Sequence, residues 1–212
     1  MKEYDNYIFD LYGTLIDIHT DERRIAPWRF MADIYSVYGC DWDAVALRHT
    51  YFALDKAGRK KLYKETGLTP EIKIERVFTK LIFECGSTHP TVTKICGISM
   101  EEWRERYRKD PDAVIDELCG SDAVTAISNV LRIASRRYIK PYENTISTLK
   151  KLRESGKGVY LLSNAQRVYT YPEIEKCIPV ELFNEMYISS DHSVMKPEPE
   201  FMDRLIKAFG LD

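Results

Sequence analysis

Three short apolar runs along the chain are each followed by polar residues, a pattern typical of buried parallel strands. The runs are residues 7–9, 159–162 and 186–188. Two further segments, 141–156 and 197–209, carry apolar residues at helical spacing, begin at a proline and end at or just before a glycine. This succession of helix and strand predicts an α/β fold with a parallel sheet.

The long middle of the chain has a different pattern, because its apolar residues recur at helical spacing and no strand is convincing. These periodicities fall at residues 28–37, 44–54, 72–83, 100–107 and 124–133. The flanking segments, 16–27 and 136–142, are charged or contain proline and are expected to be linkers between domains. We therefore predict an inserted, all-helical domain.

Composition narrows the function classes. The 212 residues include 31 Lys and Arg against 33 Asp and Glu, a net charge of −2, which argues against the basic footprint of a nucleic-acid binder. No stretch approaches the ~18 apolar residues of a membrane span, and the N-terminus has no apolar signal core. The five cysteines are scattered singly, which favours reduced thiols. The expectation is a cytoplasmic protein that acts on small ligands, without nucleic-acid or membrane partners.

Reactive side chains stand where the predicted strands end. Asp10 follows the first strand, Ser163 and Asn164 close the second, and Lys196 lies soon after the third. The carboxyl ends of parallel strands meet at one edge of a sheet, so these groups are expected to converge there. A carboxylate is a modest nucleophile that needs a nearby cation and hydrogen-bond donors. The pattern predicts an Asp10 nucleophile with Lys196 as its cationic partner.

These segments together resemble the three first motifs of the haloacid dehalogenase superfamily. Residues 9–15 (FDLYGTL) are similar to the first motif, 162–164 (LSN) to the second and 196–199 (KPEP) to the third. The resemblance covers the whole chain. It implies a three-layer, Rossmann-like core built from residues 1–16 and 139–212, with a helical cap inserted at residues 17–138.

The resemblance also implies roles for individual residues. Asp10 would form a covalent intermediate, and Lys196 would stabilise it. Substrate binding would fall to a set of small and polar residues, namely Gly13, Thr14, Ser163 and Asn164. In the family's phosphatases a Mg²⁺ ion is held by the nucleophile and by a backbone carbonyl two residues later, here Tyr12, together with acids of a fourth motif.

Tyr12 departs from the phosphatase pattern. It stands where those enzymes carry an aspartate that protonates the leaving alcohol. A phenol with a reference pKa of ~10 is a poor base at neutral pH, whereas a halide leaves without a proton. The family's dehalogenases similarly have tyrosine here and use a cap-side arginine for the substrate carboxylate. Spacing does not choose among the candidates Arg23, Arg24, Arg29 and Arg48.

The second departure lies at the C-terminal end, where the resemblance implies a further strand ending in the acidic fourth motif. From this we expect a truncated form of a longer hydrolase, with Mg²⁺ bound in the longer form, the last core strands missing, and self-association through an open edge at residues 7–9. The leading expectation is a Mg²⁺-dependent phosphatase-type hydrolase acting on a small anionic substrate. An inactive or interaction-only relative and a metal-independent 2-haloacid dehalogenase stay open as alternatives.

Overall fold

The computed structural model describes residues 4–211 and divides the chain into two compact units. The first unit contains residues up to Thr20, the segment Arg59–Lys73, and the residues from Arg136 onward. The second contains Asp21–Gly58 and Ile74–Ser135. No helix among residues 4–211 combines the length and the apolar content needed to cross a membrane.

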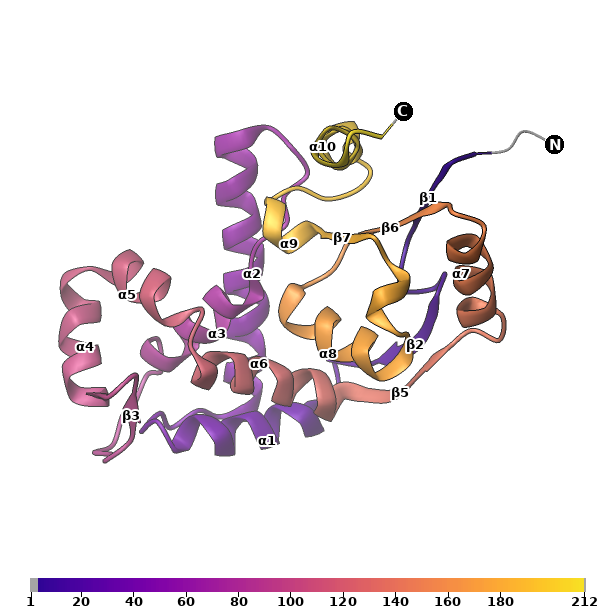
Figure 1. Cartoon of the computed structure of the whole chain (residues 1–212). Coiled ribbons are helices and arrows are strands. Elements are labelled where there is room, and N and C mark those ends of the chain that lie inside the picture. Colours follow the sequence, from indigo (N-terminus) through magenta and orange to yellow (C-terminus); the bar gives the residue numbers. More distant parts are fainter. Residues whose placement is uncertain (1–3, 212) are drawn as a thin grey trace. The chain divides into compact units, whose positions relative to one another are not determined.

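A parallel sheet of three strands organises the first unit (Figure 1). Its order is β1 (Asn6–Phe9), β6 (Gly158–Ser163), β7 (Glu185–Ile188), and the register pairs Phe9 with Leu161 and Ser163 with Ile188. The three predicted strands are thus confirmed. Among the described strands β1 pairs with β6 alone, so it forms one edge of this sheet. All three strands end on the same side, where the candidate residues follow.

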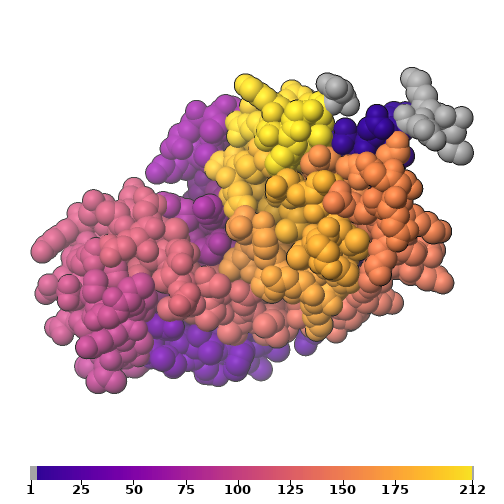
Figure 2. Space-filling view, viewed as in Figure 1, coloured from indigo at the N-terminus to yellow at the C-terminus, as the bar shows by residue number. Residues whose placement is uncertain are grey.

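Helices pack on both faces of this sheet. Val159 and Leu161 of β6 join a core with Leu149 of α7 (Thr145–Glu154) and Ile174 of α8 (Arg167–Cys177). The intervening side chains point to the opposite face, where Leu162 packs with Phe201 and Leu205 of α10 (Pro199–Phe209). This alternation is the period of two expected for a strand buried on both sides. Residues from β6 to α10, coloured orange to yellow, form one continuous surface in Figure 2.

The predicted helices α7 and α10 are confirmed, whereas α8 was not predicted. Pro172 lies inside α8, and the helix buries Tyr169, Thr170 and Glu173 as well as Ile174, so its buried side is partly polar. A helix with polar residues on its buried side lacks the apolar stripe by which an amphipathic helix is found in a sequence. The short elements η1 (Val180–Leu182) and α9 (Ser189–His192) flank β7.

The prediction that residues 16–27 and 136–142 are linkers was wrong in part, because both segments contain strands and these strands pair with each other. β2 (Ile16–Thr20) pairs antiparallel with β5 (Arg136–Pro141), and Ile18 stands opposite Ile139. The Asp17 carboxylate accepts a hydrogen bond from the Tyr138 hydroxyl at 3.1 Å. Charged and polar residues are mixed with apolar ones in both strands, a composition that also suits linkers, so the sequence did not distinguish a two-stranded ribbon from a linker.

Helices make up most of the second unit. They are α1 (Ile25–Ser36), the first part of α2 (Ala44–Thr66), α3 (Ile74–Phe83), α4 (Met100–Lys109), α5 (Pro111–Leu118) and α6 (Asp122–Ser135). Trp28, Phe78 and Trp103 are fully buried among them. The five predicted helical segments are confirmed and α5 is additional. The expectation of no strand was wrong, because β3 (Lys94–Ile95) and β4 (Ile98–Ser99) form a short antiparallel pair.

The boundaries between the units differ from the predicted domains at residues 17–20, 59–73 and 136–138, all of which group with the sheet-bearing unit. The segment Arg59–Lys73 lies within the predicted cap range, 17–138, but groups with the sheet-bearing unit. The division into a core of 1–16 plus 139–212 and a cap of 17–138 stays a prediction.

Candidate active site

Asp10 and Lys196 are in direct contact at the carboxyl edge of the sheet. The Lys196 ammonium donates hydrogen bonds to Asp10 Oδ1 at 2.7 Å and to the backbone carbonyl of Leu162 at 2.9 Å. The Asp10 side chain is 38% exposed and the Lys196 side chain 33%, so the pair is open to solvent. A charge-assisted hydrogen bond of this length orients both groups. The carboxylate and the cation are therefore placed together, with room for a ligand to reach them.

Asn164 holds the backbone of Lys196 from the end of the neighbouring strand. Its side-chain nitrogen donates to the Lys196 carbonyl at 2.9 Å, and its side-chain oxygen accepts from the Lys196 N–H at 2.7 Å. An amide carries both a donor and an acceptor, so one side chain satisfies both backbone groups. The described contacts of Asn164 thus position the lysine. Its predicted role in substrate binding stays a prediction.

The loop after Asp10 folds back on itself before β2 begins. The N–H groups of Thr14, Leu15 and Ile16 donate to the Leu11 carbonyl, and the Gly13 N–H donates to Ile16. Gly13 has φ +82°, a conformation that costs glycine little because it lacks a Cβ. Gly13 and Thr14 are exposed on this turn while Leu11 and Leu15 are buried. The turn therefore presents Thr14 at the surface and anchors the loop in the core.

Ser163 is the last residue of β6. In the chain it follows the Asp10 loop and directly precedes Asn164. It is 1% exposed, and its hydroxyl forms no hydrogen bond with any of residues 4–211. Buried polar atoms in folded proteins almost always have a partner, so such a hydroxyl requires an explanation. A donor without a protein partner at a strand end is suited to an anionic ligand.

The hydroxyl of Tyr12 is bonded to a buried carboxylate. It donates to Glu173 Oε2 at 2.5 Å, and Glu173 in turn pairs with Arg136 Nη1 at 3.0 Å. The Thr170 hydroxyl lies 3.4 Å from the Tyr12 hydroxyl oxygen. A buried carboxylate is stable when its charge is neutralised and its oxygens accept hydrogen bonds. Here Arg136 supplies the opposite charge and Tyr12 donates a hydrogen bond. These partners hold the Tyr12 ring in one orientation.

Sequence reasoning missed Glu173 and Arg136 as neighbours of Tyr12. Glu173 lies in the unpredicted helix α8, and Arg136 opens a strand that was taken for a linker. The sequence contained one signal. Glu173 is followed by apolar residues at 174 and 178, whose spacing of four indicates a helix face, and the glutamate lies beside it.

Replacing Tyr12 by phenylalanine is expected to destabilise the protein by about 2 kcal/mol, because a hydrogen bond to a charged group is lost and the Glu173 oxygen keeps only its other contacts. Urea denaturation of the variant measures the difference. Tyr142→Phe is the matched control, since Tyr142 is 42% exposed and should change stability little. Equal stabilities of the two variants would contradict the importance of the Tyr12 to Glu173 bond.

The chain just before Lys196 is held by residues 69–70, which were predicted to belong to the cap. The Met195 N–H donates to the Thr69 carbonyl at 3.2 Å, and Pro70 and Val194 form an antiparallel bridge. The Thr69 N–H and hydroxyl both bond Glu198 Oε1, and the hydroxyl is the larger cause that holds the pKa of Glu198 below its ordinary value. Bonds on either side of Lys196 thus restrain its loop.

A cluster of buried polar and charged side chains holds the same segment at Glu71. Glu71 is 4% exposed and accepts from Arg59 at 2.8 Å, from the Gln166 amide at 2.8 Å and from the Ser189 hydroxyl at 3.2 Å. Ser189 also accepts from the Ala165 N–H at 2.8 Å. Arg59 thereby neutralises a buried acid. Such a cluster ties the residues after Asn164 to the 69–71 segment.

The predicted metal ligands were tested against the donors that the structure describes. Mg²⁺ prefers six oxygen ligands in nearly octahedral geometry. Within residues 4–211 no group of three His, Cys, Asp or Glu side chains is arranged to hold a metal. The Asp10 carboxylate and the Tyr12 carbonyl alone fall short of that set, and Asp10 is already bonded to Lys196. The described residues alone therefore do not make up a magnesium site.

The cap-side arginines lie in the second unit. Arg23 and Arg48 line a cavity of about 440 Å³ together with His49 and Phe52, and Arg48 donates to the Arg23 carbonyl at 2.8 Å. Arg24 and Arg29 are exposed. Which of them binds a substrate carboxylate stays open.

Solved structures that match the chain over nearly its whole length have low sequence identity. An L-2-haloacid dehalogenase is 15% identical with a TM-score of 0.46, and the match covers 100% of this chain and 75% of that one. A HAD family enzyme from Bacteroides thetaiotaomicron, in complex with magnesium and inorganic phosphate, is 17% identical with a TM-score of 0.44, covering 99% and 81%. A predicted phosphoglycolate phosphatase from Haemophilus somnus is 15% identical with a TM-score of 0.42, covering 100% and 74%.

None of the curated proteins compared with the chain matches it. The family comparison is decisive, because the model of the haloacid dehalogenase-like hydrolases matches residues 4–212. The chain belongs to the haloacid dehalogenase-like hydrolase family.

Proposed function

We propose that this protein hydrolyses a small anionic substrate through a covalent intermediate on Asp10. The observation that supports this most is the 2.7 Å contact between Lys196 Nζ and Asp10 Oδ1 at the carboxyl edge of the parallel sheet. Ligands of open α/β sheets bind at this edge. A partly exposed carboxylate held beside an ammonium group suits nucleophilic attack on an anion.

The reaction has two steps. An Asp10 carboxylate oxygen attacks the electrophilic centre, a new bond to that oxygen forms, and the leaving group departs with the electrons of its broken bond. The Lys196 ammonium offsets the negative charge of nucleophile and substrate together. Thr14 and the unpartnered hydroxyl of Ser163 supply donors for the anion. Water then cleaves the intermediate and regenerates the carboxylate.

Tyr12 restricts the leaving group. Its hydroxyl donates to buried Glu173, and no second acid stands two residues after Asp10. An alkoxide needs a proton as it departs, whereas a halide or a weakly basic phenolate does not. A phosphate ester is the substrate that the resemblance of the three motifs makes the leading expectation. The tyrosine favours a second candidate, a 2-haloacid, and in both cases a leaving group that departs as a stable anion.

Two assays of the whole chain separate these candidates. Release of nitrophenolate from p-nitrophenyl phosphate is followed with Mg²⁺ and with a chelator, and halide release from 2-chloropropionate is followed under the same conditions. Metal-dependent nitrophenolate release supports a phosphatase-type enzyme, and metal-independent halide release supports a dehalogenase. If Asp10→Asn leaves either activity intact, the covalent mechanism is wrong. If the native chain has neither activity, the interaction-only alternative replaces this proposal.

Replacing Tyr12 by aspartate is expected to raise the hydrolysis of alkyl phosphates by about tenfold or more, because the new carboxyl group can protonate the departing alcohol. The gain should be smaller for p-nitrophenyl phosphate, whose leaving group needs no proton. The ratio of the two rates is the measurement, and Tyr12→Asn is the control of similar size without an acid. An unchanged ratio would count against the proton argument.

A further inference from the structure

Two cysteines that are far apart in the sequence meet in the second unit. Cys40 is fully buried, and its sulfur lies 2.9 Å from the Ile82 carbonyl, three residues before Cys85. The side chains of Cys40 and Cys85 lie close enough that each shifts the pKa of the other. Cys85 is partly exposed and both cysteines are free thiols. The pair therefore consists of one accessible sulfur in contact with one inaccessible sulfur.

Backbone pairing brings the two cysteines together. The His89 N–H donates to the Gly39 carbonyl at 3.0 Å and the Asp41 N–H donates to the Ser87 carbonyl at 3.2 Å, on either side of Cys40. Gly39 has φ +74°, and a Cβ on it would lie 2.5 Å from the His89 carbonyl oxygen. Only glycine permits this approach. The contact between the thiols is thus built into the fold of this unit.

The electrostatic surroundings distinguish the two thiols. The hydrogen bond from Cys40 is the largest cause that lowers the pKa of Cys85, and the Arg104 guanidinium lowers it further, whereas burial and Asp41 act in the opposite direction. The same hydrogen bond, followed by burial, raises the pKa of Cys40. A thiolate is the nucleophilic form of cysteine. Cys85, which is also the more accessible of the two, is therefore the expected attacking thiol.

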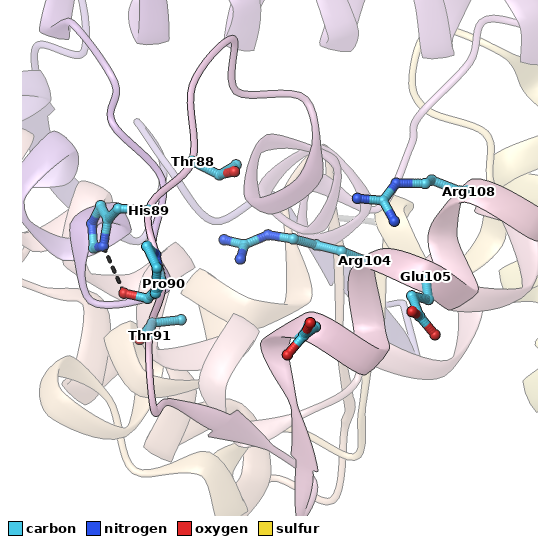
Figure 3. A pocket seen from close by; sticks show the side chains of 8 residues that line it. Thr88, His89, Pro90, Thr91, Arg104, Glu105 and Arg108 are labelled. Carbon is cyan, nitrogen blue, oxygen red and sulfur yellow. Dashed lines mark hydrogen bonds between the residues drawn. The ribbon is translucent and has the colours of Figure 1, made fainter.

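Space for a small reactant lies along the loop that follows Cys85. The loop that follows Cys85 and the guanidinium of Arg104 border a cavity of about 430 Å³ (Figure 3). In Figure 3, Arg104 extends toward the loop that carries Thr88 and Pro90, and Arg108 lies on the same helix. Arg104 Nη2 donates to the carbonyls of Tyr38 and Gly39 at 2.7 and 3.1 Å, which fixes the guanidinium next to the cysteine segment.

We propose that Cys85 and Cys40 form a thiol modification site that exchanges with low-molecular-weight disulfides, with Cys85 as the attacking thiol and Cys40 as the resolving one. The candidate site around Asp10 uses neither residue. Redox-sensitive cysteines are commonly acidic, accessible and placed next to a resolving cysteine, and this pair has all three properties.

The exchange balances in two steps. The Cys85 thiolate attacks one sulfur of an oxidised glutathione molecule, a mixed disulfide forms, and glutathione thiolate leaves and takes up a proton. Once Cys85 is bonded to sulfur, neither its hydrogen bond nor its negative charge raises the pKa of Cys40 any longer, and burial alone still does. Cys40 then loses its proton and attacks the Cys85 sulfur, and the second glutathione leaves. The protein gives up two electrons and two protons, and oxidised glutathione becomes two reduced molecules.

The test treats the whole reduced chain with oxidised glutathione at pH 7, blocks remaining thiols by alkylation, and maps the peptides by mass spectrometry. We expect a disulfide that joins the peptides of Cys40 and Cys85. Cys85→Ser should abolish it, and Cys40→Ser should leave glutathione bound to Cys85. The unsubstituted chain alone decides the main point, so a variant that fails to fold does not obscure the result.

Alkylation rates provide the matched control within the same molecule. Cys85 should react about tenfold faster than exposed Cys96 at pH 7, and its rate should level off at a pH below the ~8.5 of an ordinary thiol. Equal rates for Cys85 and Cys96 would overturn the proposal. A mixed disulfide that persists on Cys85 in the unsubstituted chain, with no bond to Cys40, would overturn it as well.

Discussion

Replacing Asp10 by asparagine is expected to lower kcat/KM by at least about 10³-fold on any substrate that the protein hydrolyses. Asparagine has nearly the same size, but its neutral amide is a poor nucleophile and leaves Lys196 without its charged partner. The side chain is 38% exposed, so the loss of the ion pair should affect folding far less than catalysis. Initial rates and urea denaturation of the same preparation separate the two effects.

Asp203→Asn is the matched control for this experiment. Asp203 is an exposed aspartate on α10, and its replacement removes the same charge. It should leave kcat/KM within about twofold of the native value. An Asp10→Asn protein that folds normally and keeps more than a tenth of the native activity would exclude Asp10 as the nucleophile.

The second large effect is expected for Lys196→Met, which should lower kcat by about 10²- to 10³-fold. Methionine keeps much of the apolar stem of lysine but removes the ammonium that contacts both Asp10 and the Leu162 carbonyl. The developing negative charge would then lack its fixed counter-charge. Most of the loss should fall on kcat, because charge accumulates further in the transition state than in the bound substrate.

Lys207→Met on α10 serves as the control. Lys207 is exposed, and its replacement removes an equal charge from the same region of the sequence. Its activity should stay close to native at moderate salt. A Lys196→Met protein with native kcat and a raised KM would instead assign the lysine to substrate binding alone.

The edge where the site lies could be predicted from the sequence because it depends on local signals. A short apolar run predicts each strand, and parallel strands bring their carboxyl ends together. This reasoning correctly brought Asp10 and Lys196 together from opposite ends of the chain. The sequence also indicated Ser163 and Asn164, but not that Asn164 would bond the lysine backbone at both N–H and C=O.

The contacts that the sequence did not predict depend on long-range packing. Glu173 meets Tyr12 only because α8 covers one face of the sheet. The segment 69–71 meets the Lys196 loop through backbone bonds, which leave no trace in residue types. In the sequence Cys40 and Cys85 are single, widely separated cysteines. Their segments come together in the fold because Gly39 permits a close backbone approach. Periodicity reports which face of an element is buried and says nothing about its partner.

The covalent intermediate is tested most directly by acid-quenching a single turnover and mapping the peptides by mass spectrometry. The substrate is whichever of p-nitrophenyl phosphate or 2-chloropropionate the protein turns over. We expect a substrate-derived adduct on the peptide that contains Asp10, present in the native chain and absent from Asp10→Asn. An adduct on a different residue, or rapid turnover that never modifies the Asp10 peptide, would contradict it.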